Sequence, residues 1–342
     1  MKKHRLYKWK DIKDRFTHNL LLGNGASIAI SESFDYRSLH QEASKGGLLS
    51  KKLQRLFGLF DTKNFELILR RLSDTRRVND ILDISESTTS ESYEELRDAL
   101  VNTVRGVHPQ YPDVESYLDR IANFMMSFDY VISLNYDLLA YWAMLVGNDL
   151  EGENRFKDCF RRDVVDGALI FDDAFEYMAE PYGDLEAATL IFYPHGNLVL
   201  ATELFGKETK LSRSKDDCLL DTILEKWQLG DYTPLFVGEG RTRDKKHAIE
   251  QSNYLTNVYN RVLATLKESL VIYGWSFGDQ DKHILDALDR AALEEIAISV
   301  YTKHRDYEDY CDNVRKKIDR THNLKDCRIS FFDAESHGCW IY

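Results

Sequence analysis

The sequence has few of the features that mark secreted, membrane-bound or metal-stapled proteins. Its five cysteines are odd in number and none has C-x-x-C spacing, which argues against a disulfide framework and against a zinc ribbon. Residues 1–16 lack the apolar core of a signal peptide, and no hydrophobic run reaches the length of a membrane span. We therefore expect a cytoplasmic protein with reduced thiols and no membrane contact.

Positive charge is also in short supply. Lysine and arginine number 45 against 57 aspartates and glutamates, so the chain carries a formal net charge of -12. A surface of this sign repels nucleic-acid phosphates, which disfavours general DNA or RNA binding. A small anionic cofactor held in a local pocket is still compatible with it.

The N-terminal segment is basic, but it also carries apolar residues at helical spacing. Leu6, Trp9, Ile12 and Phe16 recur every three to four residues. We interpret residues 1–16 as an amphipathic helix that packs on the body of the protein. A nucleic-acid-binding arm is the alternative.

The hydrophobic pattern predicts the fold class. Of the 342 residues, 43% are hydrophobic, enough to fill a large core. Short apolar runs recur, and most are continuous, which is typical of strands covered on both faces. They are residues 20–22, 130–134, 189–193, 234–237, 270–273, 296–301 and 328–332. With helical stretches between them, they predict an α/β fold with a Rossmann-like, doubly wound, mostly parallel sheet, as one domain over residues 1–342.

Two long segments interrupt this alternation. The first, about residues 32–127, is mainly helical and contains a polar loop at residues 85–92. Ser92 and Glu95 have the spacing of a capping box for the helix that follows this loop. The second segment, about residues 147–188, is acidic and mixed in pattern. We expect both segments to be insertions in the parallel scheme.

The first predicted strand ends in a glycine turn, LLLGNGAS at residues 20–27. Gly23 and Gly25 can adopt positive φ and allow a ligand to approach the backbone, and Asn24 tolerates the same bend. A helix that begins near Ser27 would aim unpaired N–H groups at a pyrophosphate. The turn lacks the third glycine of a Rossmann fingerprint and the lysine of a Walker loop, so by itself it is a weak signal.

Polar residues also follow the next two predicted strands. Asn135 and Asp137 follow the run at residues 130–134, and His195 follows the run at residues 189–193. In open α/β sheets, ligands bind at the carboxyl ends of the strands, so we expect these side chains to share a crevice with the glycine turn. The alternatives are structural, with Asp137 as a helix cap, Asn135 in a turn and His195 bonded to backbone. A neutral imidazole at this place can act as a general base near neutral pH.

A fourth strand end has the sequence GWSFGDQD at residues 274–281. Gly274 allows a close approach, and the hydroxyl of Ser276 can bond to a ribose or a phosphate. Asp281 is better explained as the N-cap of the next helix than as a ligand contact.

Taken in order, the motifs GNGAS, SLNYD, HG and GWS resemble the sirtuin fold in its divergent bacterial form, a group related to NAD-consuming phage-defence effectors. The resemblance covers residues 20–301. It implies that the glycine turn holds the NAD pyrophosphate, that the Asn-x-Asp element borders the nicotinamide ribose, that the histidine is the catalytic base and that GWS contacts the adenosine side. The implied catalytic residues are Asn135, Asp137 and His195, and the implied cofactor-binding residues are Gly23, Asn24, Gly25, Ala26, Ser27, Gly274, Trp275 and Ser276.

Two departures from that family limit what the resemblance implies. Leu134 stands where protein-deacylating sirtuins carry a glutamine, and the four-cysteine zinc module has no counterpart. Lysine deacylation is therefore in doubt, whereas the NAD site is unaffected. The resemblance implies a metal-free NAD+ glycohydrolase that releases nicotinamide and ADP-ribose, as a regulated effector of abortive infection.

The same residues are also compatible with other functions. The pocket can sense NAD or ADP-ribose without turnover, or the chain can be a structural subunit of a defence complex. An NAD-dependent dehydrogenase is a weaker hypothesis, because the chain lacks a third glycine and a convincing acidic residue at the end of a second strand. Since unregulated NAD loss would be toxic, we expect control by homo-oligomerisation or by a separate partner protein.

Overall fold

The fold is that of a computed structural model, which describes residues 4–35, 38–85, 87–151, 155–164, 167–181, 183, 185, 187–203, 206–212, 218–237, 241–303 and 307–342. Eight of its strands belong to one sheet. In chain order they are β1 (Leu6–Tyr7), β2 (Asn19–Leu22), β3 (Tyr130–Ser133), β4 (Phe156–Lys157), β7 (Thr189–Phe192), β11 (Lys267–Tyr273), β12 (Ala292–Val300) and β13 (Arg328–Asp333).

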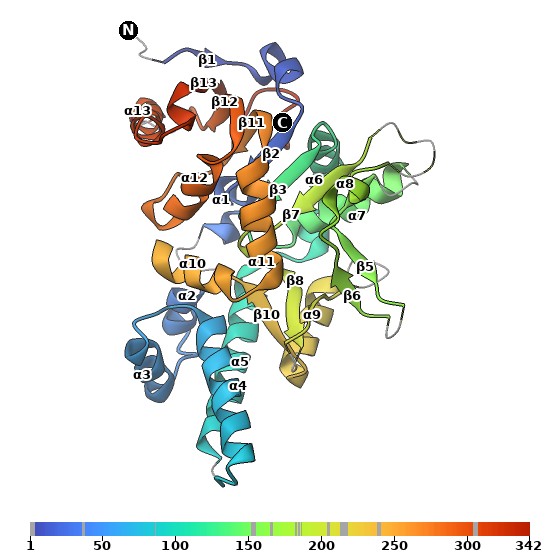
Figure 1. The fold of residues 1–342 in the computed structure, drawn as a ribbon. Coiled ribbons are helices and arrows are strands. Elements are labelled where there is room, and N and C mark those ends of the chain that lie inside the picture. The colour runs from blue at the N-terminus through green and yellow to red at the C-terminus, as the bar shows by residue number, and fades with distance from the viewer. Residues whose placement is uncertain are drawn as a thin grey trace.

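The order of strands across this sheet is β1-β13-β12-β11-β2-β3-β7-β4, and every pairing is parallel (Figure 1). The α/β class and the parallel sheet are as predicted, and the arrangement is consistent with a Rossmann-like doubly wound fold. β2 lies in the middle. The chain builds outward through β3 and β7 on one side of it, and then through β11, β12 and β13 on the other. The carboxyl end of β2 is therefore the point where the strand order reverses, which is where such sheets bind ligands.

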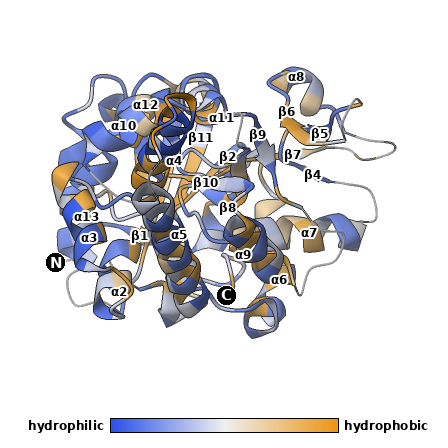
Figure 2. Ribbon diagram, turned by 90° about the horizontal axis from the view of Figure 1, so that it is seen from below, coloured by the Kyte–Doolittle hydropathy of each residue, from blue (hydrophilic) through white to orange (hydrophobic). Residues whose placement is uncertain are grey.

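Continuous burial explains why the central strands read as unbroken apolar runs. All four residues of β2 are buried, and so are the last five residues of β11. Buried side chains from Trp9 to Ile341 join in one apolar cluster. Hydrophobic residues gather on the central strands, while the outer loops and helix faces are mostly hydrophilic (Figure 2).

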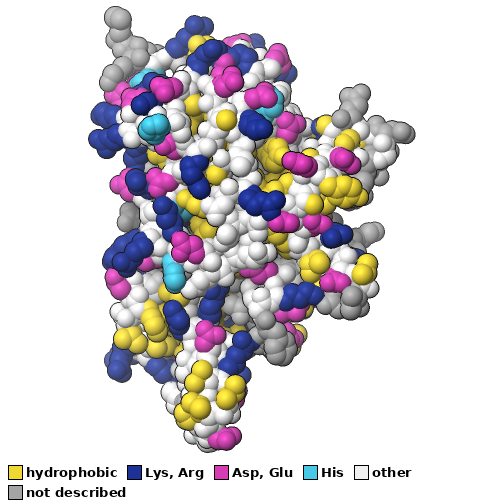
Figure 3. Space-filling view, in the orientation of Figure 1, with side chains coloured by type: hydrophobic (Ala, Val, Ile, Leu, Met, Phe, Trp, Pro, Cys, Tyr) yellow, Lys and Arg dark blue, Asp and Glu magenta, His cyan; other side chains and the backbone are white. Residues whose placement is uncertain are grey.

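Helices fill most of the chain between β2 and β3, as predicted for residues 32–127. They are α1 (Asn24–Ile28), α2 (Leu39–Lys45), α3 (Lys51–Leu59), α4 (Phe65–Ile81), α5 (Thr88–Val107) and α6 (Tyr111–Met125). α4 and α5 form a pair that projects away from the sheet (Figure 1). The end of this pair carries the exposed apolar side chains of Val78, Ile81, Leu82 and Ile84, visible as a hydrophobic tip in Figure 3.

The remaining helices are α7 (Leu139–Glu151), α8 (Phe175–Met178), α9 (Leu219–Leu229), α10 (Thr242–Glu250), α11 (Asn253–Asn257), α12 (Lys282–Leu288) and α13 (Tyr307–Ile318). Two small antiparallel sheets accompany them. One pairs β5 (Phe160–Arg162) with β6 (Leu169–Phe171), and the other has the order β10-β8-β9, formed by β8 (Gly196–Glu203), β9 (Glu208–Lys210) and β10 (Tyr232–Phe236).

The strand predicted at residues 234–237 exists, but it is not part of the parallel sheet. It is β10, the edge strand of the antiparallel sheet beside β8. Pro234 lacks a backbone N–H, which an edge strand can accommodate and the centre of a sheet cannot.

The N-terminal segment is not an amphipathic α-helix. Its described part consists of β1, which adds to the edge of the sheet beside β13, and two short 3-10 turns. Trp9, Ile12 and Phe16 are nevertheless buried, so the predicted packing on the body is correct. Spacing of three to four residues suits successive 3-10 turns as well as an α-helix, and the Trp9 N–H is tied to Ser336 Oγ at 2.9 Å.

Residues 85–92 are not a loop throughout, since α5 begins at Thr88; Glu86 lies outside the described residues. Ser92 is a buried residue within the helix, and its hydroxyl donates to the Thr88 carbonyl at 2.5 Å. The predicted capping box between Ser92 and Glu95 is therefore wrong. A serine that bonds back to residue i−4 is tolerated inside a helix, so the polar run did not mark its start.

None of the helices in the described ranges has the length and apolar character that crossing a bilayer requires. All five cysteines are free thiols, and Cys159, Cys311, Cys327 and Cys339 are buried.

Substitution of Gly274 tests the close contact between the loops after β2 and β11. Gly274 has φ of +72°, and a Cβ there would lie 2.3 Å from the Ala26 backbone nitrogen. Gly47 has φ of +69° but no atom within 4 Å of such a Cβ. We expect Gly47→Ala to lower the free energy of unfolding by about 1–2 kcal/mol through left-handed strain alone. Gly274→Ala should cost about 3–5 kcal/mol, because a backbone collision is added. Urea unfolding measures both values, and equal losses would contradict the tight contact.

Candidate functional site

A cleft of about 1870 Å³ lies at the carboxyl ends of the central parallel strands. Its floor contains the glycine turn after β2, the segment after β3 and the loop after β11, and His195 from the end of β7 joins them. The volume exceeds the 300–1,000 Å³ that is usual for small-molecule sites, so it can hold an extended ligand.

Two further parts of the chain form the walls of the cleft. The helical segment between β2 and β3 contributes Phe34, His40 and Phe57, so this insertion is part of the site. At the other end, residues after β12 and on α13 contribute tyrosines, among them Tyr301 and Tyr310. The walls are thus aromatic and polar, while the floor is built from strand ends.

The glycines of the floor are required by close packing between two loops. A Cβ on Gly23 would lie 2.6 Å from the Cα of Trp275, and one on Gly25 would lie 2.8 Å from the carbonyl oxygen of Gly274. The Gly25 N–H donates to that same Gly274 oxygen at 2.8 Å. α1 begins at Asn24 with Gly23 as its N-cap, earlier than the start expected near Ser27, and it has only five residues. The turn therefore presents fewer free N–H groups than the motif suggested.

Asn135 is held by the glycine turn. Its side-chain amide donates to the Gly23 carbonyl at 3.0 Å and to Ser27 Oγ at 2.9 Å. Both bonds use the nitrogen of the amide, so the oxygen is the atom left to accept from a ligand. Asn135 is thereby locked in one orientation at the edge of the cleft.

Asp137 is buried, and it caps a helix, as the structural alternative for this residue predicted. Its Oδ1 accepts the Leu139 N–H at 3.0 Å at the start of α7, and its Oδ2 accepts the Ser27 hydroxyl at 2.5 Å. Burial raises the pKa of Asp137 to about 6, against the opposing effect of the Ser27 hydroxyl and the Leu139 N–H. The carboxyl group therefore titrates close to neutrality.

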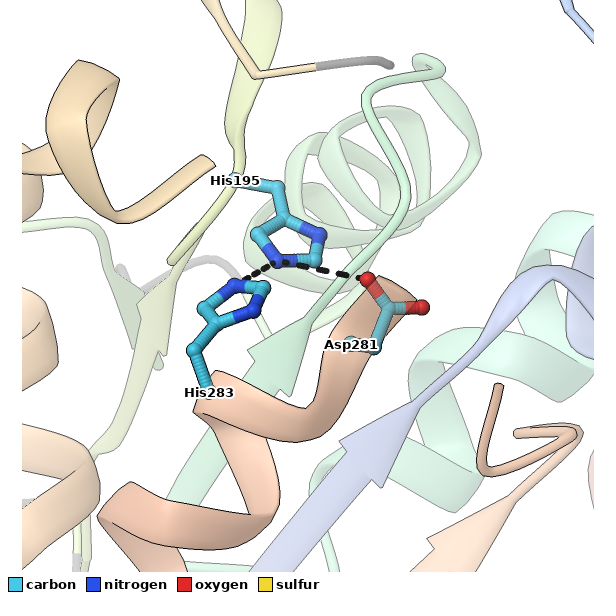
Figure 4. Close-up of side chains that lie close together, drawn as sticks. All are labelled: His195, Asp281 and His283. Carbon is cyan, nitrogen blue, oxygen red and sulfur yellow. Dashed lines mark hydrogen bonds and ion pairs between the residues drawn. The ribbon is translucent and has the colours of Figure 1, made fainter. Parts of the chain in front are cut away.

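His195 is also buried, and its Nε2 nitrogen faces two neighbouring side chains. Nε2 lies 2.8 Å from Nε2 of His283, and 3.9 Å from Oδ1 of Asp281 (Figure 4). The Leu134 backbone beside the ring acts to raise the pKa of His195. Burial, followed by the nearby Lys245 ammonium, holds the pKa of His195 well below its usual value, although the Asp281 carboxylate opposes this. The imidazole is therefore neutral at pH 7.

Asp281 occupies the N-cap position of α12, but its side chain does not cap that helix. Instead, its Oδ1 accepts from the Lys245 ammonium at 2.7 Å. Burial opposes ionisation of Asp281, but the Lys245 ammonium holds the pKa of its carboxyl below its usual value. The structure thus corrects the predicted role of Asp281, which belongs to the surroundings of His195.

Three of these side chains have donor atoms that a metal ion can use. Nε2 of His195, Nε2 of His283 and an oxygen of Asp281 lie within 4.8 Å of one another. However, the Lys245 ammonium already neutralises Asp281, and both imidazoles are neutral, so the group is electrically balanced without a cation. A divalent ion would bury two uncompensated positive charges beside Lys245, which is costly. The expectation of a metal-free site stays a prediction.

Most of the site residues predicted from the sequence line the cleft. These are Gly23, Asn24, Gly25, Asn135, Asp137, His195, Gly274, Trp275 and Ser276. Ala26 and Ser27 do not line it, because both are buried beneath the turn. Ser27 acts from behind, through its bonds to Asn135 and Asp137.

Lys245 and His283 were missed by sequence reasoning. His283 stands two residues after Asp281, directly behind the fourth strand-end motif, so the spacing D-x-H next to GWS was the available signal. Lys245 lies in the basic stretch RTRDKKH of α10, where nothing distinguishes it from its solvated neighbours.

The chain belongs to the protein family described as Domain of unknown function (DUF4917), whose model matches residues 20–340. The matched region contains all four strand-end motifs and both walls of the cleft. No curated protein sequence matches the chain. The family match says nothing about sirtuins, so the sirtuin resemblance stays a prediction.

The Ser27–Asp137 hydrogen bond predicts a pH-dependent loss of stability. Asp137 has a folded-state pKa above its usual 3.8, so its contribution to stability is fully present below about pH 4 and is lost as the pH rises through about 6. Ser27→Ala removes a donor that favours the carboxylate and raises this pKa further. We expect the variant to lose about 1.5–3 kcal/mol of unfolding free energy at pH 8 and about 1 kcal/mol at pH 5.

Ser252→Ala is the matched control, because buried Ser252 caps α11 by accepting the Leu255 N–H at 3.1 Å and has no carboxyl partner. Its loss of about 1 kcal/mol should be the same at both pH values. Equal losses for Ser27→Ala at pH 5 and pH 8 would mean that Asp137 does not titrate in this range.

Proposed function

We propose that this member of the DUF4917 family hydrolyses the nicotinamide–ribose bond of NAD, releasing nicotinamide and ADP-ribose. The observation that carries the proposal is the convergence of Asn135, Asp137 and His195 with both glycine-containing loops in one cleft at the switch point of a parallel sheet. A dinucleotide is the ligand class that such a crevice accommodates, and the sirtuin resemblance of the motifs specifies NAD.

The reaction needs three things from the protein. The bond between the nicotinamide nitrogen and the ribose carbon breaks with both electrons going to nicotinamide, and water supplies the oxygen that bonds to that carbon. The site must fix the ribose, support the positive charge that develops on it, and accept a proton from the water or a ribose hydroxyl.

The residues of the floor suit these tasks. The amide oxygen of Asn135 is held in place to accept from a ribose hydroxyl or from the water. The Asp137 carboxylate, ionised above about pH 6, stabilises the developing cation or holds the nicotinamide amide. His195 is neutral and is the proton acceptor of the set.

One feature favours a second candidate, a sensor that binds NAD or ADP-ribose without turnover. Nε2 of His195 is already engaged with His283 inside the protein, so this nitrogen is not presented to the cleft with a free lone pair. Binding without release of nicotinamide, measured by calorimetry and chromatography together, would identify this function.

The direct test is incubation of the purified chain with NAD and separation of nicotinamide from ADP-ribose. General-base assistance is worth about 10²–10⁴-fold, so we expect Asn135→Ala and His195→Ala to slow nicotinamide release by about that factor with the fold intact. Asn148→Ala is the control, because Asn148 also makes two side-chain bonds, both to the Phe156 backbone, and lies outside the cleft. Unchanged release in both site variants would refute the assignment.

The pKa of Asp137 predicts the pH profile. The carboxylate forms as the pH rises, so the rate of nicotinamide release should increase through about pH 6 and level off above it. Burial holds the pKa of His195 well below its usual value, so the carboxyl group of Asp137 is the one expected to titrate near pH 6. Asp137→Asn should remove the inflection, as followed by initial rates from pH 5 to pH 8, and an inflection that persists in this variant would assign it to another group.

A further inference from the structure

His283 faces His195 from behind the cleft. The two imidazole rings are 5.0 Å apart between centroids, and their Nε2 atoms lie 2.8 Å apart (Figure 4). His195 lines the cleft, whereas His283 is fully buried and does not line it. His283 therefore reaches the cleft only through His195.

The hydrogen-bond partners determine which nitrogen carries each proton. The Leu134 N–H already donates to the Leu22 carbonyl, so the backbone bond between Leu134 and His195 uses the Leu134 carbonyl. Because Nε2 of His195 faces His283, the N–H that donates to this carbonyl is Nδ1–H. Nε2 is then the basic nitrogen of His195, and it accepts the Nε2–H of His283.

The groups around the pair keep this arrangement neutral. Burial lowers the pKa of His283 to about 4, and Lys245 acts in the same direction. Lys246 adds to this effect, while the carboxylates of Asp281 and Asp286 oppose it. With Lys245 and Asp281 paired at 2.7 Å, two neutral imidazoles remain, joined by one N–H. Within the part of the chain that the structure describes, Nδ1 of His283 is buried without a hydrogen-bond partner.

We propose that His283 is a positioning residue that occupies the basic nitrogen of His195 in the ligand-free protein and gives it up when a ligand hydroxyl takes its place. The inference rests on the proposed function, since it states what controls the base of that reaction. The hydroxyl would enter from the cleft beside Asp281, which lines it and lies 3.9 Å from the same nitrogen.

The proton balance of this step is simple. His283 Nε2–H stops donating and keeps its proton, and the ligand hydroxyl or the water donates to Nε2 of His195 in its place. That proton then passes to His195, which becomes an imidazolium held between the Leu134 carbonyl and the Asp281 carboxylate. One hydrogen bond between neutral groups is lost before the reaction, which corresponds to about a 2- to 10-fold reduction in the fraction of productive complexes.

Two substitutions separate the donor from the shape of His283. His283→Phe keeps a ring beside His195 but has no N–H, so it frees Nε2, and we expect kcat/KM for NAD cleavage to rise about 2- to 10-fold. His283→Gln keeps an N–H donor and should stay near the unaltered protein. If the larger ring of phenylalanine prevents folding, His283→Leu replaces it with the same expectation. A fall in kcat/KM for the variants without a donor, with His283→Gln near normal, would overturn the proposal.

Nitrogen NMR of His195 tests the same contact without any reaction. In the unaltered chain at pH 7, Nδ1 should carry the proton and Nε2 should show the shift of an acceptor in a hydrogen bond. This acceptor signature should be kept in His283→Gln and lost in His283→Phe. An inactive chain with these shifts would refute the proposed function alone, whereas shifts that do not change in His283→Phe would refute the proposal for His283.

Metal analysis supplies the other decisive outcome. Suppose that the chain binds one equivalent of zinc or another divalent ion, and that His195→Ala and His283→Phe each abolish this binding. The two imidazoles would then be metal ligands. The hydrogen bond between them would then be excluded, and the proposal would be wrong. We expect no bound ion that depends on these two histidines.

Discussion

The contact between two loop backbones at the centre of the sheet is the constraint on which the site depends. The loop after β2 and the loop after β11 approach so closely that neither Gly23 nor Gly274 has room for a Cβ atom. The hydrogen bond from Gly25 to Gly274 joins them, and Asn135 is tied to the same turn through the Gly23 carbonyl. The floor of the cleft is thus held by main-chain atoms, which leaves little freedom for the side chains that it carries.

The electrostatics of the site differ from what residue types alone suggest. Histidine is the side chain that usually titrates near neutrality, and a carboxyl group is usually ionised there. Here burial acts on both: it raises the pKa of Asp137 to about 6 and holds the pKa of His195 well below its usual value. The pair Lys245–Asp281 leaves the surroundings of His195 without net charge, so the chain keeps two buried imidazoles uncharged.

Local pattern was sufficient for all the parallel strands except β1 and β4, and for most of the cleft floor, because continuous apolar runs and the polar residues after them are signals of neighbouring residues. Lys245 and His283 come close to His195 through tertiary packing. The hydrophobic periodicity of the sequence does not predict contacts between residues so far apart in the chain. In the N-terminal segment the local pattern itself was ambiguous. The apolar spacing that predicted an α-helix also fits the 3-10 turns that the structure shows. The glycines that were predicted to admit a ligand also make room for another loop, and sequence spacing does not indicate this contact.

The structure separates the chemistry of the site from the shape of its opening. Asn135, Asp137 and His195 come from strand ends and are fixed by buried hydrogen bonds, whereas the walls come from the helices after β2 and from the segment around α13. A change in the helical wall would alter the shape of the cleft, whereas the hydrogen bond between His195 and His283 lies at its floor. Ser27 and His283 do not line the cleft, but Ser27 holds Asn135 and Asp137, and His283 contacts Nε2 of His195. The side chains that face the cleft therefore depend on buried partners behind the floor for their orientation and for the placement of their protons.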